Sequence, residues 1–217
     1  MIRIAIDGPG GAGKSTIAKA VARELGIDYI DTGAMYRAVG YKMKEKGIPA
    51  GSTDKVAAML DDTDIDFSGG DTLLDGRSVS AEIRKPEISA AASECAAIPA
   101  VREKLVEIQR KMGRTKSVVM DGRDIGTNVL TDAEYKFYMT ASAEERAQRR
   151  YDELIAKGEK VDLEKVLADI KTRDHNDMTR KLNPLRKADD AIELDTTGMS
   201  IEEVTKALLS KVDRSRI

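Results

Sequence analysis

The first fifty residues alternate between short apolar runs and segments with helical spacing. Residues 2–6 are an apolar run that predicts a strand, and this run ends in a glycine-rich segment. From Ser15 onward the apolar residues recur at helical spacing as far as Gly26, a residue type typical of a helix C-terminus. Residues 29–30 predict a second short strand, and residues 33–46 a second helix. The order is therefore strand, glycine-rich loop, helix, strand, helix.

Three later apolar runs extend this pattern. They cover residues 116–120, 135–139 and, more weakly, 191–194, and segments with helical spacing separate them. Short continuous apolar strands that alternate with helices are typical of a parallel sheet covered on both faces. The pattern predicts an α/β fold.

Residues 65–80 interrupt the alternation. Short β-like pieces are separated there by Gly69-Gly70 and Asp75-Gly76, both of which are two-residue hairpin signals. We therefore expect a small antiparallel insert. Pro86 then predicts the first residue of a helix that runs through 90–97, and Pro99 the first residue of another.

Composition narrows the classes of partner. The chain has 217 residues, 34% of them charged, and a net charge of −2, which predicts one domain without a global attraction to nucleic acid or membranes. A single cysteine (Cys95) and a single histidine (His175) exclude a disulfide framework and a zinc cluster. No apolar run approaches the ~18 residues that span a bilayer, and we expect no export leader before the first strand. We expect a cytoplasmic protein.

The glycine-rich segment matches G-x-x-x-x-G-K-[ST] between a strand and a helix. Small residues allow backbone N–H groups to surround a phosphate, and the following helix adds its positive end. The pattern predicts that ATP binds at Gly8, Pro9, Gly10, Gly11, Ala12, Gly13, Lys14, Ser15 and Thr16. In this hypothesis Lys14 reaches the β- and γ-phosphates, and Ser15 ligates Mg²⁺. The alternative is a glycine-rich turn that binds nothing.

A second nucleotide-binding pattern is weak. The segment Asp195-Thr196-Thr197-Gly198 matches the D-x-x-G of a GTPase switch, but no [NT]-K-x-D motif accompanies it. We interpret it as a strand end followed by a helix that is capped by Ser200 and Glu203.

Arginines and carboxylates gather near the predicted element ends. Arg123 and Asp124 follow a predicted strand, at the edge where open α/β sheets bind ligands. Two further sets are predicted to share one helix face each: Arg146, Arg149 and Arg150, and Arg173, Asp177 and Arg180. Each set has a structural alternative. The Arg146 set could be a solvated, salt-bridged face beside Glu144 and Glu145. Arg173 and Asp177 could be an ordinary i,i+4 pair, and Asp121 and Asp124 could cap a strand-to-helix turn.

Several ordered segments together resemble bacterial cytidylate kinases. They are I-D-G-P-G-G-A-G-K-S-T, D-T-G-A-M-Y-R-A, V-S-A-E-I-R, A-A-S followed by P-x-V-R, D-G-R-D-I-G-T, and I-K-T-R-D-x-x-D-x-x-R. The resemblance implies a P-loop NTPase fold with a five-stranded parallel sheet within one domain over 1–217. It also implies a small antiparallel β insert at about 60–98 in the monophosphate-binding region and a short lid at about 146–160.

The same resemblance implies ATP- and Mg²⁺-dependent phosphorylation of CMP and dCMP by a monomeric enzyme. It places Thr32, Tyr36 and Arg37 in the acceptor site, with Arg37 on the phosphate. It places the cytosine on Ser93, Arg102 and Asp124, the sugar on Arg173 and Asp177, and phosphates near Arg123 and Arg180. The expected catalytic residues are Lys14, Arg123, Arg146, Arg149, Arg150 and Arg180. Two alternative functions are considered. One is a small P-loop kinase that acts on AMP, UMP or a non-nucleotide, and the other is a P-loop regulatory module.

Overall fold

The computed structural model describes residues 1–68 and 70–216 and divides into two compact units. Unit 1 consists of Met1–Tyr29 and Lys116–Ile217, and unit 2 consists of Ile30–Thr115. The chain leaves unit 1 within its second strand and returns before the sixth. The single domain over 1–217, the insert at 60–98 and the lid at 146–160 stay predictions.

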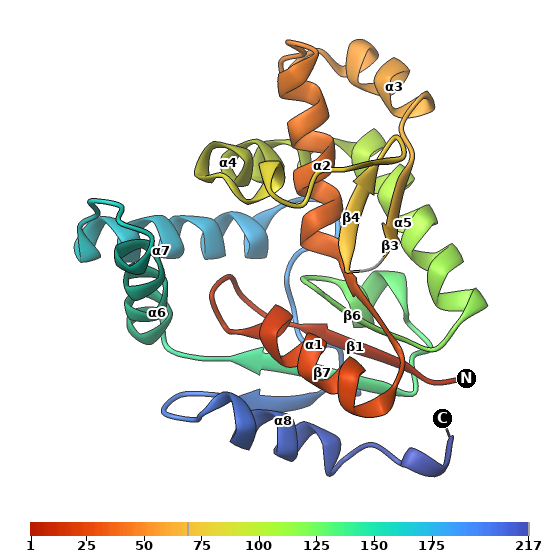
Figure 1. Cartoon of the computed structure of the whole chain (residues 1–217), viewed down its shortest axis with the longest axis vertical. Helices are drawn as coiled ribbons and strands as arrows, with labels where there is room; N and C mark the ends of the chain where they lie inside the picture. Colours follow the sequence, from red (N-terminus) through yellow and green to blue (C-terminus); the bar gives the residue numbers. More distant parts are fainter. Residues whose placement is uncertain (69, 217) are drawn as a thin grey trace. The chain divides into compact units, whose positions relative to one another are not determined.

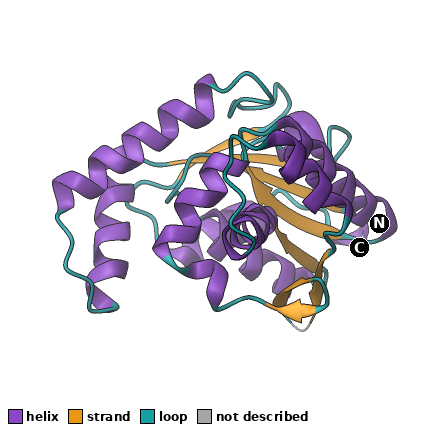
Figure 2. Ribbon diagram, turned by 90° about the horizontal axis from the view of Figure 1, so that it is seen from above, coloured by secondary structure: helices purple, strands orange, loops and turns teal. Residues whose placement is uncertain are grey.

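A five-stranded sheet organises unit 1 (Figure 1). In spatial order its strands are β2 (Asp28–Asp31), β6 (Val118–Gly122), β1 (Arg3–Asp7), β7 (Tyr135–Thr140) and β8 (Ile192–Asp195). Strand β1 pairs in parallel with β6 and β7, and β7 pairs in parallel with β8. Neighbouring strands are rotated relative to one another, as the intrinsic twist of strands requires (Figure 2).

The register of this sheet aligns the strand ends that matter for function. Asp7, the last residue of β1, lies opposite Gly122 of β6 and Tyr138 of β7. The segments that follow these three strands therefore leave from the same edge. This is the carboxyl edge, at which parallel α/β sheets bind their ligands.

Helices bury the apolar strands of unit 1. Its helices are α1 (Lys14–Leu25), α6 (Ala143–Ala156), α7 (Leu163–Thr179) and α8 (Ile201–Leu209), with a π-helical turn at Ile125–Val129 and a 3-10 turn at Arg214–Arg216. Apolar residues of α1 and α8 pack with β1, β6 and β7 in one core. Helices α6 and α7 form a smaller core around Ala147, Leu154 and Val166. Ser200 and Glu203 form the predicted capping box at the start of α8.

Unit 2 contains four helices and a small antiparallel sheet within its described residues. The elements are α2 (Thr32–Glu45), α3 (Thr53–Asp61), β3 (Ile65–Ser68), β4 (Asp71–Leu74), β5 (Arg77–Ser78), a 3-10 turn at Glu82–Arg84, α4 (Pro86–Cys95) and α5 (Pro99–Thr115). The strand order is β3-β4-β5. Asp75 and Gly76 have φ values of 51° and 76°, which is the backbone of a type I′ hairpin turn.

The predicted fold class and most predicted elements are confirmed. The antiparallel insert is present, although Gly69 of its first predicted turn lies outside the described residues. The prediction that Arg180 lies on the same helix face as Arg173 and Asp177 is wrong. Helix α7 ends at Thr179, and Arg180 has extended dihedrals (φ −59°, ψ 142°). The chain turns back there, because Leu185 N donates to the carbonyl of Asp177 at 2.8 Å. Across the described residues, no helix combines the length and apolarity that crossing a membrane requires.

Candidate functional site

The glycine-rich loop leaves β1 in the geometry that a phosphate-binding loop requires. Gly8 has φ 147°, and a Cβ at this position would lie 2.0 Å from the carbonyl oxygen of Met139 in β7. Only glycine can therefore start the loop so close to the neighbouring strand. Gly13 has φ 81° and precedes the first helical residue, Lys14. The loop thus delivers its backbone N–H groups at the N-terminus of α1, which favours an anion.

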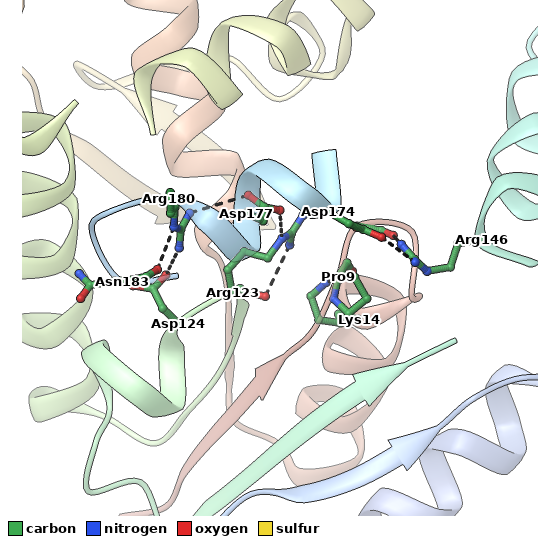
Figure 3. A network of polar contacts seen from close by, with 11 residues as sticks. Pro9, Lys14, Arg123, Asp124, Arg146, Asp174, Asp177, Arg180 and Asn183 are labelled. Atoms are coloured by element: carbon green, nitrogen blue, oxygen red, sulfur yellow. Dashed lines mark hydrogen bonds and ion pairs between the residues drawn. The ribbon is translucent and has the colours of Figure 1, made fainter. Parts of the chain in front are cut away.

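Lys14 is the buried cation of this loop. Lys14 is 5% exposed, and its Nζ donates to the carbonyl of Pro9 at 2.7 Å (Figure 3). Burial, together with the positive charge of Arg123, lowers the pKa of Lys14 to about 7, against the opposing influence of Asp121 and Asp7. An anion bound in the loop would raise this pKa again.

Ser15 meets a carboxylate that the sequence interpretation did not assign to the site. Ser15 Oγ donates to Asp121 Oδ2 at 2.9 Å, and Tyr29 OH donates to Asp121 Oδ1 at 2.7 Å. Asp121 lies within β6, so the suggestion that it merely caps a turn is wrong. An acidic residue at the end of a buried apolar run was the available signal. Hydroxyl and carboxylate oxygens are ligands that Mg²⁺ prefers.

Arg146 of α6 forms hydrogen bonds that hold the glycine-rich loop in place (Figure 3). Nη1 donates to the carbonyl of Gly10 at 2.9 Å, Nε to the carbonyl of Ala141 at 2.9 Å, and Nη2 to Asp174 Oδ2 at 2.7 Å. The side chain is 6% exposed. The alternative of a solvated face is therefore wrong for Arg146, and its acidic partner Asp174 comes from α7, 28 residues away.

The other two arginines of α6 are more exposed. Arg149 pairs with Glu145 and donates to the carbonyl of Thr196 at 3.0 Å, and its Nη1 lies 4.0 Å from the Cβ position of Gly13. Arg150 pairs with Glu153 at 3.2 Å on the surface of the same helix. The salt-bridged face that was the structural alternative therefore describes Arg150 well and Arg149 in part.

A network of four charged residues lies next to the loop (Figure 3). Arg123 Nε donates to Asp177 Oδ2 at 2.7 Å, and Arg180 Nη2 donates to Asp124 Oδ1 at 3.1 Å. Arg180 Nη1 also lies 3.9 Å from Asp177 Oδ1. Although burial alone would raise the pKa of Asp177, Arg123, Arg173 and Arg180 hold it below its usual value. Arg123 and Asp124 come from the segment after β6, Asp177 comes from the end of α7, and Arg180 directly follows this helix.

Arg173 also belongs to this neighbourhood. A Cβ at Gly10 would lie 3.4 Å from Arg123 Nη2 and 3.7 Å from Arg173 Cδ, so both arginines lie beside the loop. Asp177 forms an ion pair at 2.7 Å with Arg123, which lies outside α7, and the charge of Arg173 also lowers the pKa of Asp177. Unit 1 therefore gathers Lys14, Arg123, Arg146 and Arg173 around one loop.

Unit 2 contains the other predicted site residues. Thr32 is buried at the start of α2, where Asp31 accepts from Ala34 N and pairs with Arg37 Nη2 at 3.0 Å. Nε of Arg37 is buried and makes no hydrogen bond within the described residues. Asp31 was missed by the sequence interpretation, although an aspartate directly before a helix is a recognisable cap.

Tyr36 and Arg102 are brought together although α2 and α5 are far apart in sequence. The guanidinium carbon of Arg102 lies 5.8 Å from the ring centroid of Tyr36, which is a cation–π distance, and Arg102 is 3% exposed. Ser93 is exposed on α4. Unit 2 therefore places an arginine against an aromatic face, and a second arginine beside the start of α2.

Comparison with known proteins agrees with these observations. The family model described as cytidylate kinase matches residues 4–214. A cytidylate kinase of Caldicellulosiruptor saccharolyticus is 53% identical over 212 residues, which cover 96% of this chain and 94% of the relative. A cytidylate kinase of Clostridioides difficile is 51% identical over 210 residues, covering 97% of each chain. A crystal structure of an uncharacterized protein from Eubacterium ventriosum has a similar fold, with a TM-score of 0.56, 15% identity and 97% of each chain covered.

Proposed function

The chain belongs to the cytidylate kinase family, and from this premise we propose that it transfers the terminal phosphate of ATP to CMP and dCMP. The products are CDP and dCDP. Family membership over residues 4–214 makes the protein a phosphotransferase that uses a nucleotide donor. The observation that carries the proposal is the loop with its buried Lys14, next to Arg123, Arg146 and Arg173 at one edge of the sheet.

The donor side is proposed to bind the triphosphate of ATP. The N–H groups of residues 8–16 surround the phosphates, and Lys14 contacts the β- and γ-phosphates. Ser15 and Asp121 fit Mg²⁺, because a hydroxyl and a carboxylate oxygen lie 2.9 Å apart beside the loop. Mg²⁺ is commonly held by one or two protein oxygens together with substrate phosphates. When bound, the ion neutralises charge on the phosphate oxygens.

The acceptor is proposed to bind at the residues that the family resemblance indicates. Arg37 contacts the phosphate of CMP, helped by Arg123 and Arg180, and Thr32 and Tyr36 line the site. The buried Nε of Arg37 supports this role, because it is a donor without a hydrogen-bond partner in the described chain. The proposed contacts to the cytosine are Ser93, Arg102 and Asp124, and those to the sugar are Arg173 and Asp177.

The reaction needs little proton transfer by the protein. The acceptor phosphate has a second pKa of ~6, so it is mostly ionised at pH 7. The barrier arises from repulsion between anions and from charge on the migrating group, and positioned cations lower it. Lys14, Arg123 and Arg180 are proposed to supply this charge, together with Arg146, Arg149 and Arg150 of a lid that excludes water.

The base contacts predict selectivity for cytosine. The N4 amine of cytosine donates, and N3 and O2 accept, so a carboxylate such as Asp124 and a donor such as Arg102 match this pattern. Asn128 Nδ2 and Arg180 Nη2 each donate a hydrogen bond to the Asp124 carboxylate, at 3.1 Å, and so hold it in place. Uracil reverses the pattern at two positions and would leave buried polar groups unmatched, which a polar site rejects strongly.

A coupled assay with CMP, dCMP, UMP, AMP and no acceptor tests the proposal. We expect ADP formation with CMP and dCMP, and kcat/KM for UMP at least ~100-fold lower than for CMP. Equal use of CMP and UMP would refute the base contacts. Preference for AMP would support a different kinase, and slow ATP hydrolysis that ignores all four acceptors would support a regulatory module. The monomeric state and cytoplasmic location stay predictions.

A further inference from the structure

Asp7 is a buried carboxylate that the mechanism above does not use. It is the last residue of β1, directly before Gly8, and it is 4% exposed. Its Oδ1 accepts from the backbone N–H of Ile125 at 2.8 Å, and its Oδ2 accepts from the N–H of Gly126 at 2.7 Å. One carboxylate therefore binds two consecutive amides that lie 118 and 119 residues further along the chain.

These two amides belong to the turn that follows Arg123 and Asp124. The pairing of β1 with β6 ends at Asp7 and Gly122, so the sheet itself does not hold the residues beyond Gly122. The same turn orients the Asp124 side chain, because Asn128 N donates to the Asp124 carbonyl at 2.9 Å and Asn128 Nδ2 donates to Oδ2 at 3.1 Å. The carboxylate of Asp7 thus adds a constraint just where the strand pairing stops.

We propose that Asp7 is a positioning residue that fixes Arg123 and Asp124 relative to the phosphate-binding loop. The inference rests on the proposed function, in which the loop binds the donor while Arg123 and Asp124 bind the acceptor. A displacement of about 1 Å between reacting groups can cost ~100-fold in rate. A rigid link between these two segments therefore has a direct effect on transfer.

The surroundings of Asp7 are consistent with an ionised acceptor of two hydrogen bonds. Burial raises the pKa of Asp7 to about 6, whereas the amides of Gly126 and Ile125 and the charge of Lys14 favour the ionised form. Space is also limited, since a Cβ at Gly126 would lie 3.4 Å from Asp7 Oδ2 and 3.1 Å from Lys136 Cδ. The carboxylate and the turn therefore fit closely.

The substitution Asp7→Asn tests the role with little change in size. The amide keeps one oxygen as an acceptor, but its NH₂ group faces one of the two backbone N–H groups. We expect kcat/KM for CMP to fall ~100-fold, while the Kd for MgATP, measured by calorimetry, changes less than about threefold. Amide exchange at Ile125 and Gly126, measured by NMR, should accelerate at least about tenfold.

Glu134→Gln is the matched control. Glu134 Oε2 accepts from the backbone N–H of Arg3 at 2.8 Å, so this variant also weakens a bond between a carboxylate and an amide of β1, but at the opposite end of the strand. It should leave the kinetics with CMP and the exchange at Ile125 and Gly126 unchanged. The inference would be overturned if Glu134→Gln lowered kcat/KM for CMP as much as Asp7→Asn does. It would also be overturned if Asp7→Asn weakened the binding of MgATP as much as it lowers kcat/KM for CMP. Should the unmodified protein fail to phosphorylate CMP, the proposed function fails, and the exchange measurement still decides whether Asp7 holds the turn.

Discussion

The glycine-rich loop and the neighbouring network of Arg123, Asp124, Asp177 and Arg180 present positive charge in different ways. In the loop, Lys14 is held by the carbonyl of Pro9, only five residues away. In the network, each arginine is held by a carboxylate 54 or 56 residues away along the chain. The loop is a local structure, whereas the network exists only once α7 has returned to the segment after β6.

The difference reflects the chemistry of the two cations. A buried lysine can lower its pKa, and that of Lys14 is about 7. An arginine remains charged and therefore requires carboxylate partners when it is buried. Its five donors allow it to keep a carboxylate and still bind a phosphate. The charge of the loop therefore changes with pH, whereas the stability of the network depends on each of its ion-pair partners.

The largest effect is expected from Lys14→Met. Methionine approximates the length of the side chain without its charge, so turnover should fall by at least ~1,000-fold because the proposed contact of Lys14 with the β- and γ-phosphates is lost. The melting temperature should change by no more than a few degrees, because the variant removes a desolvated ammonium group. Steady-state kinetics and thermal unfolding measure the two effects. Near-normal turnover would remove the loop from the proposed mechanism.

Arg180→Ala should have the next largest effect. It removes the ion pair between Arg180 and the Asp124 side chain, which is 8% exposed, and it removes a proposed phosphate contact. We expect kcat/KM for CMP to fall ~100-fold and the free energy of unfolding to fall by about 2 kcal/mol. The Kd for MgATP should stay within threefold of the unmodified value, roughly 0.7 kcal/mol. An effect on ATP binding larger than that on CMP would mean that Arg180 contacts the donor.

The pH dependence of ATP binding should show a smaller effect, which distinguishes the loop from the network. Lys14 has a pKa of about 7, and phosphates would raise it, so binding above pH 7 requires uptake of a proton. The Kd for ATP should therefore increase about tenfold between pH 6 and pH 8, with the larger part above pH 7. Calorimetry in buffers with different ionisation enthalpies measures the uptake. Lys14→Met is the control, because it keeps the titration of ATP itself; equal uptake by the variant would contradict the assignment.

The sequence alone was sufficient for features with local causes. The motif from Gly8 to Ser15, the turn at Asp75-Gly76 and the cap at Ser200 each depend on residues within a few positions of one another. Alternating apolar runs also predicted the parallel sheet correctly. The roles of the individual site residues stay predictions.

Other features of the site were inaccessible to spacing arguments because they depend on the strand order. Asp7 meets Ile125 and Gly126 only because β6 lies next to β1 in the sheet. Likewise, Arg146 finds Asp174 only when α6 and α7 pack against each other. Helical spacing placed Arg180 on α7, but the hydrogen bond from Leu185 to Asp177 ends the helix one residue earlier.

The smallest effect is expected from Arg150→Ala, since this arginine is part of neither the glycine-rich loop nor the network of Arg123, Asp124, Asp177 and Arg180. Its side chain is 38% exposed, and its partner Glu153 lies on the same helix, so the pair should contribute at most about 1 kcal/mol to stability. We expect kcat to fall about fivefold through lost charge in the proposed lid, with unchanged thermal unfolding. Arg150→Lys should restore most of the rate, because only the charge is required. A loss of ~100-fold that lysine does not restore would instead indicate bidentate contact with the migrating phosphate.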